Sequence, residues 1–182
     1  GWGLAALDIT TGLFKITELH GDNTESLLVD ELEKLDPKEI ILSEINLKED
    51  NKTKWLESWD HCLHYCEDWT FSHNEAYRRL IEHFKTGSLE GFGCEELNFA
   101  VSAAGALIHY LHETQKSALE HISAINTFNI HNYMLIDQAT VHSLELVQSS
   151  EGERRNSLLG LLDLSQTSMG ARRIREWILK PL

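Results

Sequence analysis

The sequence predicts an α/β domain with a mixed sheet, followed by a shorter segment that is mainly α-helical. Three observations support this fold class. Two apolar, β-rich runs joined by a short turn open the chain, and helical and strand-like patterns alternate after them. From residue 119 onward, the recognisable patterns are helical. We therefore expect one domain over residues 1–118, and a linker with the first part of a helical domain over residues 119–182.

The first domain is expected to begin with a β-hairpin. Its strands are the apolar runs at 2–9 and 13–19, and Gly12 supplies the positive φ that the turn between them requires. Helices and short strands follow, as judged from apolar residues at helical spacing and from buried-strand patterns. In chain order these are a helix that starts after Asp22 or Asn23 and stops at Pro37, a strand at 39–43, a short helix at 52–59, a strand at 61–66, and helices at 74–84 and 95–116.

The second segment begins with a connection over residues 119–132, and two helices are expected after it. The first of these spans residues 154–164. The second spans residues 169–180, with Thr167 or Ser168 as its N-terminal cap and Pro181 as its stop signal.

Acidic and basic side chains are unevenly distributed along the chain. Residues 1–120 carry 23 acidic and 10 basic side chains, whereas residues 121–182 carry six of each. An acidic surface repels the phosphates of nucleic acids, which proteins bind mainly through Lys and Arg. The first domain is therefore expected to bind another protein rather than nucleic acid.

Cysteine content and motifs narrow the class of protein further. Three cysteines without regular spacing argue against a disulfide framework and for a reducing compartment. No run of 18 apolar residues is present, so no membrane span is expected. The sequence contains neither a Gly-x4-Gly-Lys-[Ser/Thr] phosphate-binding loop nor a Gly-x-Ser-x-Gly nucleophile motif. Because the sequence starts without Met, we expect the numbering to begin inside a longer chain.

One carboxylate is a candidate catalytic residue. Asp8 ends the first predicted strand and precedes a Thr-Thr-Gly turn, the arrangement with which ribonuclease H-like nucleases and actin-like kinases begin. A two-metal nuclease needs further carboxylates, such as Glu44. We favour a structural role, in which Asp8 braces the hairpin and Glu44 is a solvated strand end, because no other Asp or Glu has a compelling place.

The predicted strand at 61–66 contains a candidate zinc site. Cys62, His64 and Cys66 would share one face of that strand, and Cys94 would complete a set of four ligands. Adjacent strand positions rarely converge on one tetrahedral ion, and the Cys-x2-Cys knuckle typical of zinc sites is missing. A packed, partly buried strand is therefore the favoured interpretation.

The last predicted helix carries a basic stripe. One interpretation of the stripe is phosphate binding. Because apolar residues of the same helix must pack, we favour packing together with structural ion pairs to acids such as Glu176. The stripe consists of Arg172, Arg173, Arg175 and Lys180.

The same region carries the most specific motif in the sequence. Residues 157–182 resemble the core-domain signature of the MutS family of DNA mismatch-repair ATPases, with Ser165 at a position where Thr is usual. Residues 134–146 are similar to a second element of that family, but residues 141–143 depart from the more usual Arg-Arg-Asn. The matching residues are Leu162, Asp163, Thr167, Met169, Gly170, Arg172, Trp177, Pro181 and Leu182 in the first motif, and Asp137, Thr140, Leu144, Glu145 and Leu146 in the second.

The resemblance covers essentially the whole chain and implies a fragment of a larger protein. It implies that residues 1–118 are the connector domain, with a ribonuclease H-like fold, and that residues 119–182 begin the helical core domain that leads to the lever arms. It implies no catalytic, cofactor-binding or metal-binding residue in this fragment, since ATP and Mg²⁺ belong to the ATPase domain of the full-length protein. A cytoplasmic location and a homo-oligomer are expected for that full-length protein.

The resemblance also implies partners. Full-length members of the family bind mismatched duplex DNA, and their connector domain contacts the MutL protein. Arg78 and Arg79 are the only adjacent arginines in the acidic first domain, and we expect them on the outer face of the helix at 74–84, as a candidate MutL interface. The implied role is to couple mismatch binding to the ATPase. Two alternatives remain open: a divalent-metal nuclease built on Asp8, and a MutS paralogue that acts in recombination.

Overall fold

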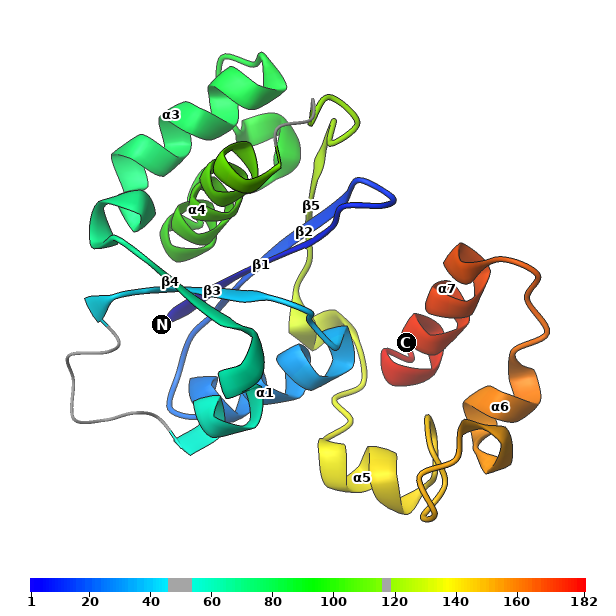
Figure 1. The fold of residues 1–182 in the computed structure, drawn as a ribbon. Helices are drawn as coiled ribbons and strands as arrows, with labels where there is room; N and C mark the ends of the chain where they lie inside the picture. Colours follow the sequence, from blue (N-terminus) through cyan, green and yellow to red (C-terminus); the bar gives the residue numbers. More distant parts are fainter. Residues whose placement is uncertain (46–53, 116–118) are drawn as a thin grey trace. The chain divides into compact units, whose positions relative to one another are not determined.

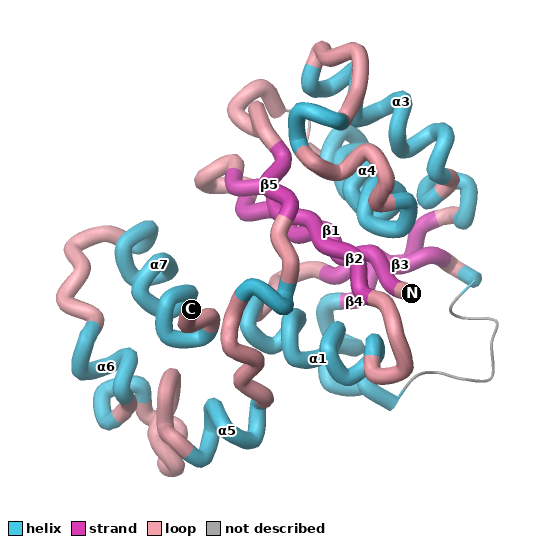
Figure 2. The backbone as a smooth tube through the Cα atoms, turned by 180° about the vertical axis from the view of Figure 1, so that it is seen from behind, coloured by secondary structure: helices cyan, strands magenta, loops and turns pink. Residues whose placement is uncertain are grey.

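The computed structural model describes residues 1–45, 54–115 and 119–182. It divides into two compact units, Gly1–Phe128 and Asn129–Leu182, which we call unit 1 and unit 2. Figures 1 and 2 show the elements of both units. Within the described ranges, no helix has the length and apolar character needed to cross a membrane.

Unit 1 is built on a mixed three-stranded sheet in the order β1-β2-β5. Strands β1 (Trp2–Asp8) and β2 (Leu13–Leu19) form the predicted antiparallel hairpin, with Gly12 at φ 70° in its turn. Strand β5 (Ile125–Thr127) runs parallel to β2. A second, parallel pair joins β3 (Ile40–Ser43) to β4 (Leu63–Cys66). The predicted α/β class with a mixed sheet is confirmed.

In the described part of unit 1, helices α1 (Thr24–Leu35) and α4 (Asn98–Thr114) pack on the sheet, and α3 (His73–Phe84) packs on α4. Helix α4 packs against β1, with α3 as an outer layer. Helix α1 contacts β1 and β2 on the other side of the hairpin. Three 3₁₀ segments complete the unit: η1 (Lys54–Cys62), η2 (Asp68–Phe71) and η3 (Glu90–Phe92). The predicted short helix at 52–59 corresponds to η1, although residues 52 and 53 lie outside the described ranges.

The contact between α3 and α4 is unusually close because a glycine lies in it. A Cβ atom added at Gly105 would lie 2.3 Å from the Cα of Ala76, so the two helix backbones meet where neither residue carries a large side chain. Around this point the core contains fully buried residues from both helices and from the sheet. These include Phe14, Ile16, Leu80, Val101 and Ile108.

Helix α4 is capped by a residue far away in the sequence. The side chain of Glu18 on β2 accepts hydrogen bonds from the backbone N–H groups of Phe99 (2.7 Å) and Ala100 (3.1 Å). A carboxylate at this position satisfies two of the orphan donors of the first turn and complements the helix dipole. The sheet therefore fixes the start of the helix that packs on it.

The segment at 119–128 belongs to the body of unit 1. Leu119 and Ile122 are buried in its core, and β5 follows them in the sheet. The predicted domain boundary at 118/119 stays a prediction, but the compact unit continues to Phe128 because β5 pairs with β2.

His83 on α3 forms a hydrogen bond to the segment at 119–128. Its Nε2–H donates to the carbonyl of Ile122 at 2.9 Å, and its ring lies 4.8 Å edge-on to Phe84 and 5.8 Å from His112. Burial lowers the pKa of His83, the hydrogen bond to Ile122 opposes this change, and nearby His112 lowers the pKa further. The folded unit therefore favours the neutral imidazole.

The lowered pKa of His83 predicts an acid-sensitive unit 1. Below the ordinary histidine pKa of about 6.5, the unfolded chain takes up the proton more readily than the folded chain. The free energy of unfolding of unit 1 is thus not reduced by His83 above about pH 6.5. It falls as the pH drops from there toward the lower pKa of His83 in the folded chain. Between pH 7.5 and 5.5, urea unfolding should show a smaller fall in the free energy of unfolding for His83→Gln than for the wild type. Glutamine keeps a hydrogen-bond donor but does not titrate. Equal losses in both proteins would contradict the assignment.

Unit 2 consists of short helices whose starts are fixed by side-chain caps. Helix α5 (Gln138–Ser143) follows the cap residue Asp137, which accepts the N–H of Thr140 at 2.8 Å. Helix α7 (Ser168–Leu179) follows Thr167, which accepts the N–H of Gly170 at 3.1 Å, as one of the two predicted starts. Each cap satisfies a backbone donor that the helix itself leaves unpaired.

The predicted single helix at 154–164 is wrong. The structure has a 3₁₀ turn, η5 (Arg154–Asn156), and then a separate five-residue helix, α6 (Leu158–Leu162). Ser157 between them is extended (φ −100°, ψ 168°), and its hydroxyl accepts the N–H of Gly160 at 3.1 Å. The same hydroxyl lies within hydrogen-bonding distance of the carbonyls of Arg154 (2.6 Å) and Val147 (2.9 Å). The helical pattern is interrupted because Ser157 acts as an N-cap tied to another part of the unit.

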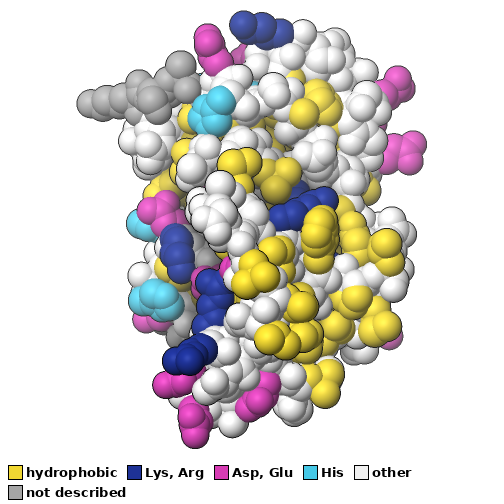
Figure 3. Space-filling view, turned by 90° about the vertical axis from the view of Figure 1, so that its right-hand side faces the viewer, with side chains coloured by type: hydrophobic (Ala, Val, Ile, Leu, Met, Phe, Trp, Pro, Cys, Tyr) yellow, Lys and Arg dark blue, Asp and Glu magenta, His cyan; other side chains and the backbone are white. Residues whose placement is uncertain are grey.

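Unit 2 buries a small core and exposes many apolar side chains. Val141, Leu146 and Leu179 form one buried cluster, and Ile130 and Leu159 are also buried. By contrast, Leu161 is 73% exposed and Trp177 is 62% exposed. In the view of Figure 3, several hydrophobic side chains lie at the surface. A core of this size gives little reserve of stability.

Candidate partner interface on helix α3

The segment before helix α3 carries an aromatic side chain close to the two arginines of the candidate interface. Helix α3 begins after Ser72, whose carbonyl accepts the N–H of Ala76 at 2.8 Å, and the 3₁₀ turn η2 directly precedes it. Ala76 and Leu80 face the core at helical spacing, and Arg78, between them, is exposed. Arg78 and Arg79 lie on this outer part of α3.

The two arginines have different environments. The side chain of Arg78 is 62% exposed and pairs with Glu75, one turn earlier, at 2.6 Å. Arg79 is half-buried: its Nη1–H donates to the carbonyl of Thr70 at 3.0 Å. The guanidinium carbon of Arg79 also lies 5.0 Å from the ring centroid of Trp69. Arg79 is thus held in one conformation, whereas Arg78 is free to exchange Glu75 for another carboxylate.

Trp69 is the residue that sequence reasoning missed. Its side chain is 49% exposed, although it lies between the guanidinium of Arg79 and the ring of His109, which it meets edge-on at 5.2 Å. An exposed tryptophan held on two sides offers apolar area at low entropic cost. The sequence feature that could have identified Trp69 is its position directly after two acidic residues, Glu67 and Asp68.

Together these residues can recognise a surface that combines apolar area with carboxylates. Arginine forms bidentate hydrogen bonds to carboxylates, and tryptophan fills a partner's apolar pocket. We call Trp69, Arg78 and Arg79 the α3 surface. Its place in unit 1 is notable because residues 1–120 carry more than twice as many acidic as basic side chains.

The structure gives Asp8 a bracing role in the hairpin turn. Its Oδ1 accepts the N–H of Thr10 at 3.0 Å, and its carbonyl accepts the N–H groups of Thr11 and Gly12. The side chain of Glu44 is exposed after β3. In the described ranges, no group of three or more His, Cys, Asp or Glu side chains is arranged to hold a metal ion. The geometry gives no support to the nuclease alternative.

The cysteines are placed as packing residues. Cys62 precedes β4 and is buried, with its thiol donating to the carbonyl of Trp59 at 3.3 Å, and Cys94 is buried in the main core. Burial raises the pKa of each of these thiols, and that of Cys66 is raised further by Glu113 and Glu44. Protonated thiols are poor metal ligands and poor nucleophiles. His64 is exposed on β4, with its ring 5.8 Å from Tyr110.

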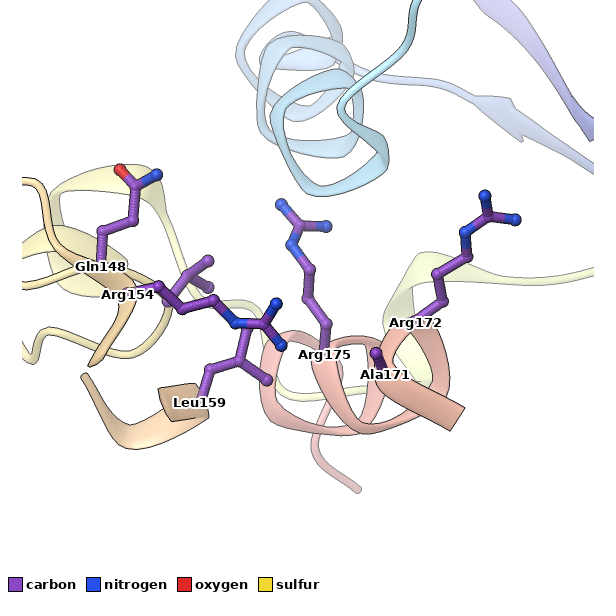
Figure 4. Close-up of a pocket in the computed structure, with 7 residues that line it drawn as sticks. Gln148, Arg154, Leu159, Ala171, Arg172 and Arg175 are labelled. Carbon is purple, nitrogen blue, oxygen red and sulfur yellow. The ribbon is translucent and has the colours of Figure 1, made fainter. Parts of the chain in front are cut away.

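The three arginines of the basic stripe lie on α7, and Lys180 directly follows the helix. Arg173 pairs with Glu176 at 2.9 Å and lies 5.6 Å over the ring of Trp177, so the predicted ion pair to Glu176 is confirmed for this residue. Arg172 and Arg175 line a hollow in unit 2 together with Arg154 and Leu159 (Figure 4).

Comparison with known proteins agrees with the resemblance seen in the sequence. The family model for MutS domain II matches residues 1–123, and that for MutS domain III matches residues 139–182. The DNA mismatch repair protein MutS of Symbiobacterium thermophilum is 40% identical over 183 residues, which cover 100% of this chain and 21% of that protein. MutS proteins of Protochlamydia amoebophila (39% identity) and Porphyromonas gingivalis (40%) also match 100% of the chain, and 21% and 19% of their own lengths.

The chain spans about a fifth of the length of these curated relatives. Its two matched regions follow one another as a connector domain and the start of a core domain. On this evidence, the chain belongs to the MutS family of DNA mismatch repair proteins.

Proposed function

We propose that this segment connects the mismatch-reading and ATPase ends of a MutS protein and offers the α3 surface to a MutL-type partner. It carries out no catalysis of its own in this proposal. Binding of mismatched DNA, hydrolysis of ATP with Mg²⁺ and assembly into a homo-oligomer belong to the full-length protein. The observation that carries the docking role is the exposed Trp69, held by Arg79 beside the exposed Arg78.

Preorganisation supports this assignment. Fixing a long side chain at an interface costs about 0.5–1.5 kcal/mol of conformational free energy. Arg79 is already fixed by the Thr70 carbonyl and the Trp69 ring, so the partner meets a conformation that needs little further ordering. Tryptophan and arginine are also the residues most enriched among interface hot spots.

Charge distribution supports the choice of the same surface. A partner that carries carboxylates is repelled by most of unit 1 and attracted at Arg78 and Arg79, which fixes where it docks. Arg78 already forms an ion pair with Glu75 in the free protein. A carboxylate of the partner would replace this ion pair, so its contribution to the binding free energy is only the difference between the two pairs. The apolar area of Trp69 is therefore expected to supply most of the affinity.

Binding of the chain to purified MutL tests the proposal. We expect Trp69→Ala to weaken binding by at least tenfold, since a hot-spot residue costs about 2 kcal/mol or more when truncated. Arg78→Glu with Arg79→Glu should weaken it by a similar factor, with a salt dependence that is smaller than in the wild type. Calorimetry at two salt concentrations measures both effects.

A charge-matched control makes this test specific. Lys38 is 86% exposed and pairs with Asp36, so Lys38→Glu changes the net charge of unit 1 as Arg78→Glu does, at a place outside the α3 surface. Binding should be nearly unchanged by Lys38→Glu. If Lys38→Glu weakened binding as much as Arg78→Glu, or if Trp69→Ala had no effect while the thermal transition of unit 1 was unaltered, the docking site would lie elsewhere.

A further inference from the structure

Trp69 is held by contacts that an exposed side chain usually lacks. Its backbone lies in η2, where the carbonyl of Trp69 accepts the N–H of Ser72 at 3.1 Å and the next residue, Thr70, is buried. Its indole N–H donates to the side chain of Glu67, and the guanidinium of Arg79 lies over its ring. These contacts come from the segment of Trp69 itself and from α3.

A further contact comes from the helix beneath α3. The ring of His109 on α4 meets that of Trp69 edge-to-face, with 5.2 Å between the ring centroids and 63° between the ring planes. Helix α4 packs on β1, whereas α3 lies outside α4, and η2 contacts both helices (Figure 1). His109 therefore joins the exposed tryptophan to the helix that lies on the sheet.

The ring of His109 is itself restrained. The side chain is only 21% exposed, and its Nε2 lies 3.5 Å from Oε1 of Glu113, one turn further along α4. The first turn of α4 is fixed by the carboxylate of Glu18 on β2. The position of the His109 ring is thus set by the core of unit 1.

The three side chains around Trp69 restrain different parts of its indole. Glu67 holds the ring nitrogen, Arg79 covers a face, and His109 forms the edge-to-face contact. Arg79 and Trp69 both belong to the outer layer, so they could shift together if nothing referred them to α4. The contact with His109 opposes such a shift.

We propose that His109 is a positioning residue of the α3 surface, which holds the Trp69 ring in the orientation that a MutL-type partner binds. This inference rests on the docking role proposed above. Edge-to-face pairs are favourable because the positive edge of one ring meets the negative face of the other. Without His109, the indole would lose one of its restraints, and a partner would have to order the ring on binding.

The orientation of Trp69 can be tested in the free chain. Incorporation of 5-fluorotryptophan gives one ¹⁹F signal for each of the five tryptophans, and Trp69→Phe identifies the signal of Trp69. In His109→Ala we expect that signal to sharpen and to move toward the position of the free amino acid, because the ring moves more freely. His109→Phe keeps an aromatic ring at this place, so it should restore most of the wild-type line width and position.

Binding of purified MutL tests the consequence for docking. His109→Ala should weaken binding about three- to tenfold, because the need to order one more side chain at an interface changes affinity by this factor. In the Trp69→Ala background, the same change should have no further effect, since no ring is left to position. An effect that persists in this background would mean that His109 acts on the partner directly or through the fold, and would overturn the proposal.

His112 supplies a matched control on the same helix. Its side chain is exposed, and its ring lies 5.8 Å from that of His83. His112→Ala also removes a histidine from α4, but it should leave the Trp69 signal and the MutL affinity unchanged. Equal effects of His109→Ala and His112→Ala would contradict a positioning role. If thermal unfolding shows that alanine at 109 destabilises unit 1, His109→Leu gives the same comparison with the space filled.

The two measurements separate this inference from the docking proposal. If Trp69→Ala leaves MutL binding unchanged, the docking role fails, and the ¹⁹F signal of the free chain still decides whether His109 holds the ring. If Trp69→Ala weakens binding but His109→Ala does not, the α3 surface stands and the positioning role of His109 is refuted.

Discussion

Replacement of Gly105 by alanine should destabilise unit 1 by about 3 kcal/mol, although the same change stabilises most helices. Alanine normally gains about 1 kcal/mol over glycine inside a helix. Here the added Cβ would lie 2.3 Å from the Cα and 2.4 Å from the Cβ of Ala76, where an ordinary contact needs about 3.5–4.0 Å. The clash is with backbone, so it cannot be relieved by a rotamer change, and α3 must move away from α4.

This movement would open the core on both sides of the contact. Leu80 on α3 and Ile108 on α4 belong to the same buried cluster and would lose part of their packing. Thermal and urea unfolding should register the loss, with the melting temperature of unit 1 falling by on the order of 10 °C. Because α3 carries Arg78 and Arg79, the variant should also weaken MutL binding at temperatures where the wild type is fully folded.

Gly87 provides the matched control for this prediction. A Cβ at Gly87 meets no atom within 4 Å, and its backbone is not in the left-handed region. Gly87→Ala should therefore be neutral or slightly stabilising, by about 0.4–1 kcal/mol, because it restricts the unfolded chain. If Gly105→Ala proved as stable as Gly87→Ala, the close approach of α3 and α4 would be wrong.

Gly160→Ala should unfold unit 2 selectively. A Cβ at Gly160 would lie 2.0 Å from the carbonyl oxygen of Arg154 and 2.9 Å from that of Arg155, so α6 could not keep its place beside η5. Overpacking of this kind costs about 1–3 kcal/mol or more. The described buried apolar residues of unit 2, such as Leu146, Leu159 and Leu179, make a small core, so we expect this cost to exceed the stability of unit 2.

Amide hydrogen exchange can resolve this effect by region. Protection of α6 and α7 should be lost in Gly160→Ala, while α3 and α4 keep their protection. Leu161 is the next residue of α6 and is 73% exposed, so Leu161→Ala should change stability by no more than about 0.5 kcal/mol. Retained protection of α6 in Gly160→Ala would contradict the structure at this point.

Much of unit 1 follows from local sequence patterns. The hairpin follows from two β-rich runs and a glycine at a position that requires positive φ. Helix α3 follows from the spacing of Ala76 and Leu80, and the same spacing placed Arg78 on the exposed face. These features are predictable because they depend on near neighbours in the chain, whose geometry is the same in any fold.

Other features depend on residues that the sequence keeps far apart. The break between η5 and α6 occurs at Ser157, whose hydroxyl reaches both the nearby carbonyl of Arg154 and the distant carbonyl of Val147. The sequence predicts a connection over residues 119–132, whereas residues 125–127 pair with β2 as strand β5 and unit 1 continues to Phe128. Both outcomes depend on long-range hydrogen bonds.

The sequence by itself determined the family, the α/β class and the helices with strong periodicity, since the matching motifs and spacings lie within short stretches. Only the tertiary structure decided which charged side chains work together. It set Trp69 against Arg79 in the α3 surface, and it brought the carboxylate of Glu18 on β2 to the first turn of α4. The physical reason is that side-chain contacts depend on helix rotation and on the packing of distant elements, which periodicity alone does not specify.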